Sequence, residues 1–173
     1  MSFGRQKRLL LGWMALLAPV PSHADPGTGG APGSWLSGYA GARTLGMGGA
    51  FVATADDALG VLWNPAGLQW MDQNQAMFES VRLFEDTSIN SLSFALPGSR
   101  LPSLGISMVS LRSGEFQRTN ELNTVLGTFS EGETAYLFSL SKGFSKRWSV
   151  GTNFKLVNQT VEDFSGTGFG VDI

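Results

Sequence analysis

The chain has 173 residues, of which 42% are hydrophobic and 15% charged, with a formal net charge of −2 at pH 7. It has no cysteine, and its one histidine, His23, falls in the leader described below. Disulfides, thiol nucleophiles and zinc sites built from cysteine or histidine are therefore excluded for the rest of the chain. The acidic balance and the scattered basic residues argue against nucleic acid as a partner.

Residues 1–24 have the features of a secretory signal peptide. Basic residues near the start precede an apolar run over 9–20, and small residues stand at positions −3 and −1 of a cleavage site after Ala24. The apolar run is too short to span about 30 Å of hydrocarbon as a helix, so we expect export rather than a membrane anchor. Residues 25–40 begin with a Gly/Pro-rich stretch, which predicts a mobile mature N-terminus.

Residues 41–74, here called the glycine-rich segment, contain the highest density of small side chains in the chain. Gly46, Gly48 and Gly49 allow the backbone to turn sharply and to lie close against another surface. We therefore expect this segment to fold as a compact plug.

A short helix is predicted inside the glycine-rich segment. Thr54 and Asp57 fit a capping box, which predicts a helix from Ala58 to Trp63. Asn64-Pro65 ends it, because the residue before a proline is pushed out of the α region. The Asn64 side chain can fix the following turn by bonding to its own backbone two residues on.

The sequence GARTLGMGGAFVATADDA (41–58) followed by LWNPAGL (62–68) resembles the start of the PorV/PorQ family, which is related to the FadL-type (long-chain fatty-acid transporter) superfamily of bacterial outer-membrane β-barrels. The resemblance implies an N-terminal hatch ahead of the barrel strands. It also implies passage of a hydrophobic ligand or a role in protein secretion. The sequence ADDALGVLWNPAGL (55–68) is more similar to the secretion members of this family than to the transport members. The implied hatch residues, structural or adjacent to a ligand, are Gly46, Gly48, Gly49, Asp56, Asp57, Trp63, Asn64 and Pro65.

From Gln75 onward the hydrophobic period changes to two, which predicts half-buried strands. The better strands are as long as tilted membrane strands, which need about 9–11 residues. Two short connections, 97–103 and 143–147, alternate with the longer 112–133 and 160–166, a pattern typical of outer-membrane barrels. The expected strands are 76–84, 88–96, 104–111, 134–142, 148–159 and 167–173.

We therefore predict an all-β fold, in which residues 75–173 are the N-terminal part of an antiparallel transmembrane β-barrel behind the hatch. About six strands are too few for a barrel of the usual minimum of about eight, so we expect a longer parent protein. The expected location is the bacterial outer membrane. The expected partners are the lipid bilayer and a hydrophobic small molecule or secretion-system proteins. A soluble exported β-protein with a structural or binding role is the alternative.

No catalytic, cofactor-binding or metal site is predicted, and we expect no enzyme activity. Asp56 and Asp57 resemble a carboxylate pair, but adjacent aspartates at a helix start more often serve as cap and dipole partners. The Gly46–Gly49 stretch lacks the strand and the Lys-Ser/Thr of a phosphate loop. The Asn64 corner either holds the plug in place or contacts a ligand. Lys155 and Asp172 are expected to point inward, where they pair or polarise the lumen.

Overall fold

The computed structural model of the protein describes residues 32–37, 41–145 and 147–173. The predicted signal peptide (1–24) lies outside these residues, as do 25–31 and 38–40 of the predicted mobile N-terminus. Within the described ranges, no helix is both long and apolar enough to cross a bilayer.

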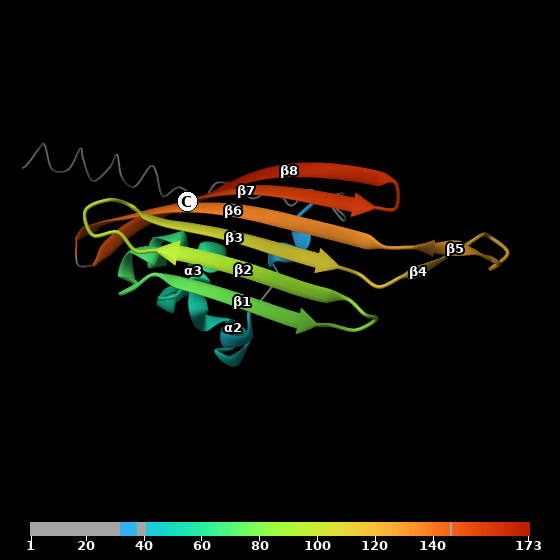
Figure 1. Ribbon diagram of the computed structural model, residues 1–173, viewed down its shortest axis with the longest axis horizontal. Coiled ribbons are helices and arrows are strands. Elements are labelled where there is room, and N and C mark those ends of the chain that lie inside the picture. Colours follow the sequence, from blue (N-terminus) through green and yellow to red (C-terminus); the bar gives the residue numbers. More distant parts are fainter. Residues whose placement is uncertain (1–31, 38–40, 146) are drawn as a thin grey trace, which may run out of the picture.

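Six antiparallel strands form the main sheet, in the order β1-β2-β3-β6-β7-β8 (Figure 1). The prediction of an all-β fold is confirmed, and each of the expected strands is present. The described strands form an open sheet with β1 and β8 at its edges. The strands are β1 (Gln75–Arg82), β2 (Ser88–Leu96), β3 (Ser103–Arg112), β6 (Glu131–Ser145), β7 (Trp148–Val161) and β8 (Phe164–Asp172).

The stretch 112–133, expected to be a loop, contains a second sheet. Strands β4 (Phe116–Thr119) and β5 (Val125–Phe129) pair as a hairpin that projects beyond the end of the main sheet (Figure 1). The Phe116 and Phe129 rings pack across the hairpin with centroids 5.5 Å apart. Polar residues stand between the apolar ones in this stretch, so the sequence pattern does not indicate the pairing.

The connection between β7 and β8 also differs from the prediction of a longer loop over 160–166. β7 continues to Val161 and β8 begins at Phe164, so Glu162-Asp163 forms a tight turn. Glu162 has φ = 55°, in the left-handed region that non-glycine residues adopt rarely. Its carboxylate lies 2.6 Å from the Arg118 guanidinium of the hairpin, which holds the turn against β4.

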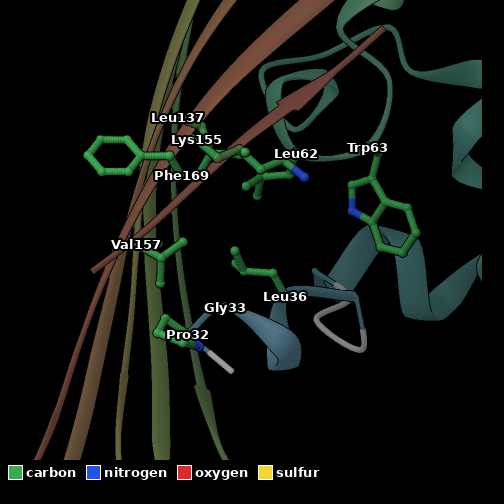
Figure 2. A pocket seen from close by; sticks show the side chains of 11 residues that line it. Pro32, Gly33, Leu36, Leu62, Trp63, Leu137, Lys155, Val157 and Phe169 are labelled. Atoms are coloured by element: carbon green, nitrogen blue, oxygen red, sulfur yellow. The ribbon is translucent and has the colours of Figure 1, made fainter. Parts of the chain in front are cut away.

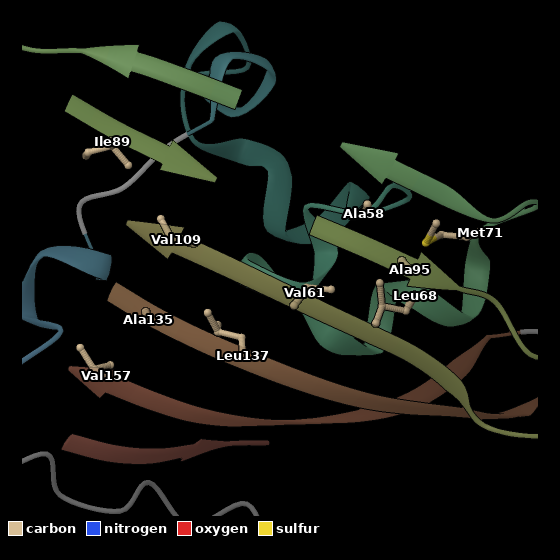
Figure 3. Packing of buried hydrophobic residues seen from close by; sticks show 10 residues of the cluster. All are labelled: Ala58, Val61, Leu68, Met71, Ile89, Ala95, Val109, Ala135, Leu137 and Val157. Carbon is tan, nitrogen blue, oxygen red and sulfur yellow. The ribbon is translucent and has the colours of Figure 1, made fainter. Parts of the chain in front are cut away.

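The glycine-rich segment covers one face of the sheet, here called the covered face; the opposite face is the open face (Figure 1). Figure 3 shows Val61 and Leu68 of the segment packed among Ala95, Val109 and Leu137 of the strands. The helical turns that lie on this face are η1 (Ser34–Ser37), α2 (Ala42–Gly46), η2 (Ala50–Thr54), α3 (Gly60–Trp63) and η3 (Pro65–Trp70).

The predicted helix is present but begins later, at Gly60, and the predicted capping box does not form. Thr54 ends η2, and its hydroxyl donates back to the carbonyl of Phe51 at 3.4 Å. Asp57 provides the local cap instead, because its carboxylate accepts from the Leu59 N–H at 2.8 Å. An aspartate that bonds two residues on is a turn former, so it starts the turn that leads into α3.

The two faces of the sheet have opposite compositions. On β3, Ile106 points to the open face and is 53% exposed, whereas its neighbour Ser107 is 5% exposed on the covered face. Ser107 bonds to Ser93 of β2, with the hydroxyl oxygens 2.8 Å apart. The same alternation of buried and exposed positions runs through β2, β6 and β7. Most large apolar side chains of these strands lie on the open face, whereas the covered face combines small and polar residues with the buried Ile89, Val109, Leu137 and Val157.

The N-terminal residues 32–37 lie on the covered face, near the start of β6. The Trp35 indole N–H donates to the Glu133 carboxylate at 2.6 Å, and the Gly33 N–H donates to the same oxygen at 2.8 Å. Glu133 is only 4% exposed, so these bonds satisfy a carboxylate that water scarcely reaches. Residues 32–37 are thereby held against the sheet.

Candidate functional site

The candidate site is the corner between α3 and η3, where three of the predicted residues meet. Asn64 accepts from the Ala66 N–H at 3.2 Å, which confirms the predicted bond to its own backbone two residues on. Its amide also donates to the carbonyl of Val52 at 2.9 Å. Pro65 occupies the first turn of η3, where its fixed φ and missing N–H suit a helix start. The corner is therefore fixed on both sides.

The corner is bonded directly to strands β6 and β7. The Ala66 carbonyl accepts from the hydroxyls of Ser141 and Ser149, at 3.2 and 3.0 Å. Gly151 lies beneath this contact, and a Cβ placed there would come within 2.3 Å of the Ala66 nitrogen. Small side chains on the covered face thus let the corner backbone lie against the sheet. The period-two spacing of these residues marks the covered face, but nothing in the sequence indicates that they contact the corner.

Two amide side chains extend this contact along the sheet. Asn153 donates to the carbonyl of Val61 at 2.8 Å and accepts from Ser139 at 3.1 Å. Gln69 donates to the Gly98 carbonyl at 2.9 Å and accepts from the Gly143 N–H at 3.1 Å. These bonds satisfy backbone groups of α3 and of the strand ends that the packing hides from water.

The predicted carboxylates Asp56 and Asp57 form an ion cluster with Arg43. The Arg43 guanidinium lies 2.8 Å from Asp56, contacts Asp57 as well, and stacks over the Phe51 ring at 5.2 Å. The hydrogen bond from Arg43 lowers the pKa of Asp56 and, together with the bond to Asp57, raises the pKa of Arg43. Stability from the Asp56 pair is therefore present at neutral pH and is lost as the pH falls through that lowered pKa.

The cluster ties the start of the glycine-rich segment to the turn before α3. Asp57 also caps Leu59, so both carboxylates are engaged within the segment. No group of three or more potential metal-ligating side chains occurs among the residues that the structure describes.

The three predicted glycines were expected to lie close against another surface, and the structure shows that they do not. Gly48 and Gly49 adopt positive φ, at 62° and 81°, and a Cβ at Gly46, Gly48 or Gly49 would meet nothing within 4 Å. Their role is to let the backbone turn between α2 and η2. Close approach occurs instead at Gly67, where a Cβ would lie 2.0 Å from the Ala55 carbonyl oxygen.

Lys155 and Asp172 pair across β7 and β8, with the ammonium nitrogen 2.5 Å from the carboxylate. Of the two alternatives for these charges, the structure shows the ion pair. The pair lies beside the corner, because Asp172 and Trp63 border the same hollow at the start of β7.

Comparison of the chain with protein-family models, curated proteins and solved structures finds no match. The geometry itself identifies the corner as a joint, in which the Asn64-Pro65-Ala66 turn fastens the glycine-rich segment to β6 and β7.

A Gly151→Ala substitution tests this joint. The added methyl collides with the backbone at Pro65 and Ala66, which cannot move without breaking the Ser141 and Ser149 bonds. We expect the free energy of unfolding to fall by about 1–3 kcal/mol in a denaturant titration. Gly166→Ala is the matched control, since its Cβ would meet only Pro32 at an ordinary 3.5 Å. Equal effects at both positions would contradict the joint.

Proposed function

We propose that the protein is an outer-membrane β-barrel protein of the PorV/PorQ and FadL-like type, which acts in transport across, or secretion at, the bacterial outer membrane. One observation carries the proposal: the face of the sheet opposite the glycine-rich segment exposes large apolar side chains across several neighbouring strands. The motif resemblance over 41–68 supports the same reading, because that stretch forms the layer on the covered face.

A sheet with this composition fits a lipid environment. Large contiguous apolar patches on a protein surface mark a membrane or a partner. Lipid fits this patch because it spans several neighbouring strands, and membrane strands alternate apolar-out with polar-in. In the bilayer, the edges β1 and β8 must be closed by further strands, since hydrocarbon cannot bond to open backbone groups. The open-face residues include Leu92, Phe94, Ile106, Met108, Tyr136, Phe138 and Phe154.

The connections at the two ends of the sheet support one orientation of the protein in the outer membrane. The connection after β2 lies beside η3, since Gln69 of η3 bonds to Gly98. The β4–β5 hairpin projects from the opposite end (Figure 1). Short periplasmic turns and longer extracellular excursions are the pattern of outer-membrane barrels. We therefore assign the corner to the periplasmic mouth and the hairpin to the cell exterior, which makes the glycine-rich segment a plug of the inner mouth.

The projecting hairpin favours the secretion branch of the proposal. Its tip carries apolar side chains that no described residue covers, with Leu122 85% and Leu126 62% exposed. The Arg118–Glu162 pair fixes its base to the β7–β8 turn. A hairpin with an apolar tip outside the membrane can dock another protein, whereas passage of a small molecule does not need it.

An Ile106→Arg substitution tests the membrane assignment. In phospholipid vesicles, a charge in the middle of a lipid-facing strand should lower the free energy of unfolding by about 2–4 kcal/mol. In water, a side chain that is 53% exposed should tolerate arginine with a change of about 0.5 kcal/mol or less. Gln117→Arg, on the hairpin, is the control and should have no effect in vesicles. A small effect for Ile106→Arg in vesicles would contradict the assignment.

A Leu122→Ser/Leu126→Ser double variant separates secretion from transport. Both side chains lie on the hairpin, away from the main sheet, so the protein should reach the membrane in unchanged amount. We expect proteins to be lost from the cell surface and the medium, measured by quantitative proteomics, while uptake of apolar compounds stays normal. An unchanged surface and secreted proteome would refute the secretion branch.

A further inference from the structure

A cavity of about 340 Å³ lies between the N-terminal residues 32–36, α3 and strands β6 to β8. Figure 2 shows Leu36, Leu62 and Trp63 on one side of this space and Val157 on the sheet opposite. The Phe169 ring points away from the cavity, on the other side of the sheet (Figure 2). The volume and the mainly apolar lining are those of a site for a small organic molecule, at the lower end of the usual range.

One polar group at this cavity has no partner. The Trp63 indole nitrogen is buried and has no hydrogen-bond acceptor among the described residues. Figure 2 places this nitrogen on the side of the ring that faces the cavity. An indole N–H can only donate, and a buried donor left unpaired is unfavourable. An acceptor oxygen that reached it would relieve this cost.

Among the residues that the structure describes, Lys155 is the only charged one that lines the cavity, and its charge is already neutralised. The Lys155 ammonium lies 2.5 Å from the Asp172 carboxylate, so the pair carries no net charge. A ligand carboxylate would have to compete with Asp172 for the ammonium and would be repelled by it. A neutral ligand oxygen meets neither obstacle, so the pair favours a neutral ligand over an acid.

The part of the cavity lining formed by the N-terminal residues 32–36 is held in place by hydrogen bonds. Gly33 lines the cavity and, together with Trp35, is bonded to the Glu133 carboxylate. These bonds fix η1 against β6, so the space between η1 and α3 exists before a ligand arrives. A preformed site avoids the cost of ordering the chain on binding.

We propose that this cavity binds a neutral, mainly apolar small molecule that carries a single acceptor oxygen, such as a ketone, ester or ether, and that this oxygen accepts from the Trp63 indole. The site refines the transport branch of the proposed function and rests on it for its physiological role. Binding itself does not require transport, so the two can fail separately.

Three probes of similar size separate the chemistries: butyrophenone, butylbenzene and 4-phenylbutyrate. The full chain in phosphatidylcholine vesicles is dialysed to equilibrium against each probe, and uptake by protein-free vesicles is subtracted. We expect the ketone to bind about tenfold more tightly than the hydrocarbon, because only the ketone satisfies the indole. The carboxylate should bind more weakly than the ketone. Equal affinities, or a preference for the carboxylate, would overturn the proposal.

Two variants assign the effect to the cavity. Trp63→Phe should abolish the preference for the ketone while keeping the binding of butylbenzene, and Leu36→Trp should fill the space and abolish both. Trp70→Phe is the control, because Trp70 lies on η3 and does not line the cavity. A ketone preference that survives in Trp63→Phe would refute the assignment. If the chain does not enter vesicles, the membrane proposal fails, and the same dialysis without lipid still tests the cavity.

Discussion

The contact between the Pro65-Ala66 backbone and Gly151 is the constraint on which the rest of the structure depends. A peptide backbone can lie directly against a sheet only where side chains are small and where its carbonyls find donors. Ser141 and Ser149 supply the donors, and the glycine supplies the space. Where the corner lies against β6 and β7, the covered face must therefore carry small and polar residues.

Most of the large apolar residues of these strands lie on the open face. Since successive side chains of a strand alternate between faces, a strand that gives serine and glycine to the plug gives leucine, isoleucine and phenylalanine to the other side. A water-soluble sheet has the reverse arrangement, with its apolar face against the core. The open face is the one that the proposed function places against lipid, and the proposed ligand cavity lies between η1 and α3 on the covered face.

The sheet could be predicted from the sequence because period-two alternation is a local signal. The Asn64 turn could be predicted for a similar reason, since its hydrogen bond spans two residues. The partners of the corner could not, because Ser149 and Ala66 are brought together only by the fold. The roles of the glycines were misassigned, since sequence alone does not separate the positive φ of Gly48 from the close approach at Gly151.

The proposal that lipid lies against the open face is tested most directly by measuring the environment of two adjacent residues on β3. The chain has no cysteine, so single spin labels can be attached at Met108→Cys and Ser107→Cys without background. In vesicles, the label at Met108 should collide with oxygen and be shielded from a water-soluble nickel chelate, whereas the label at Ser107 should be shielded from both. Free access of the nickel chelate to the Met108 label would contradict the account.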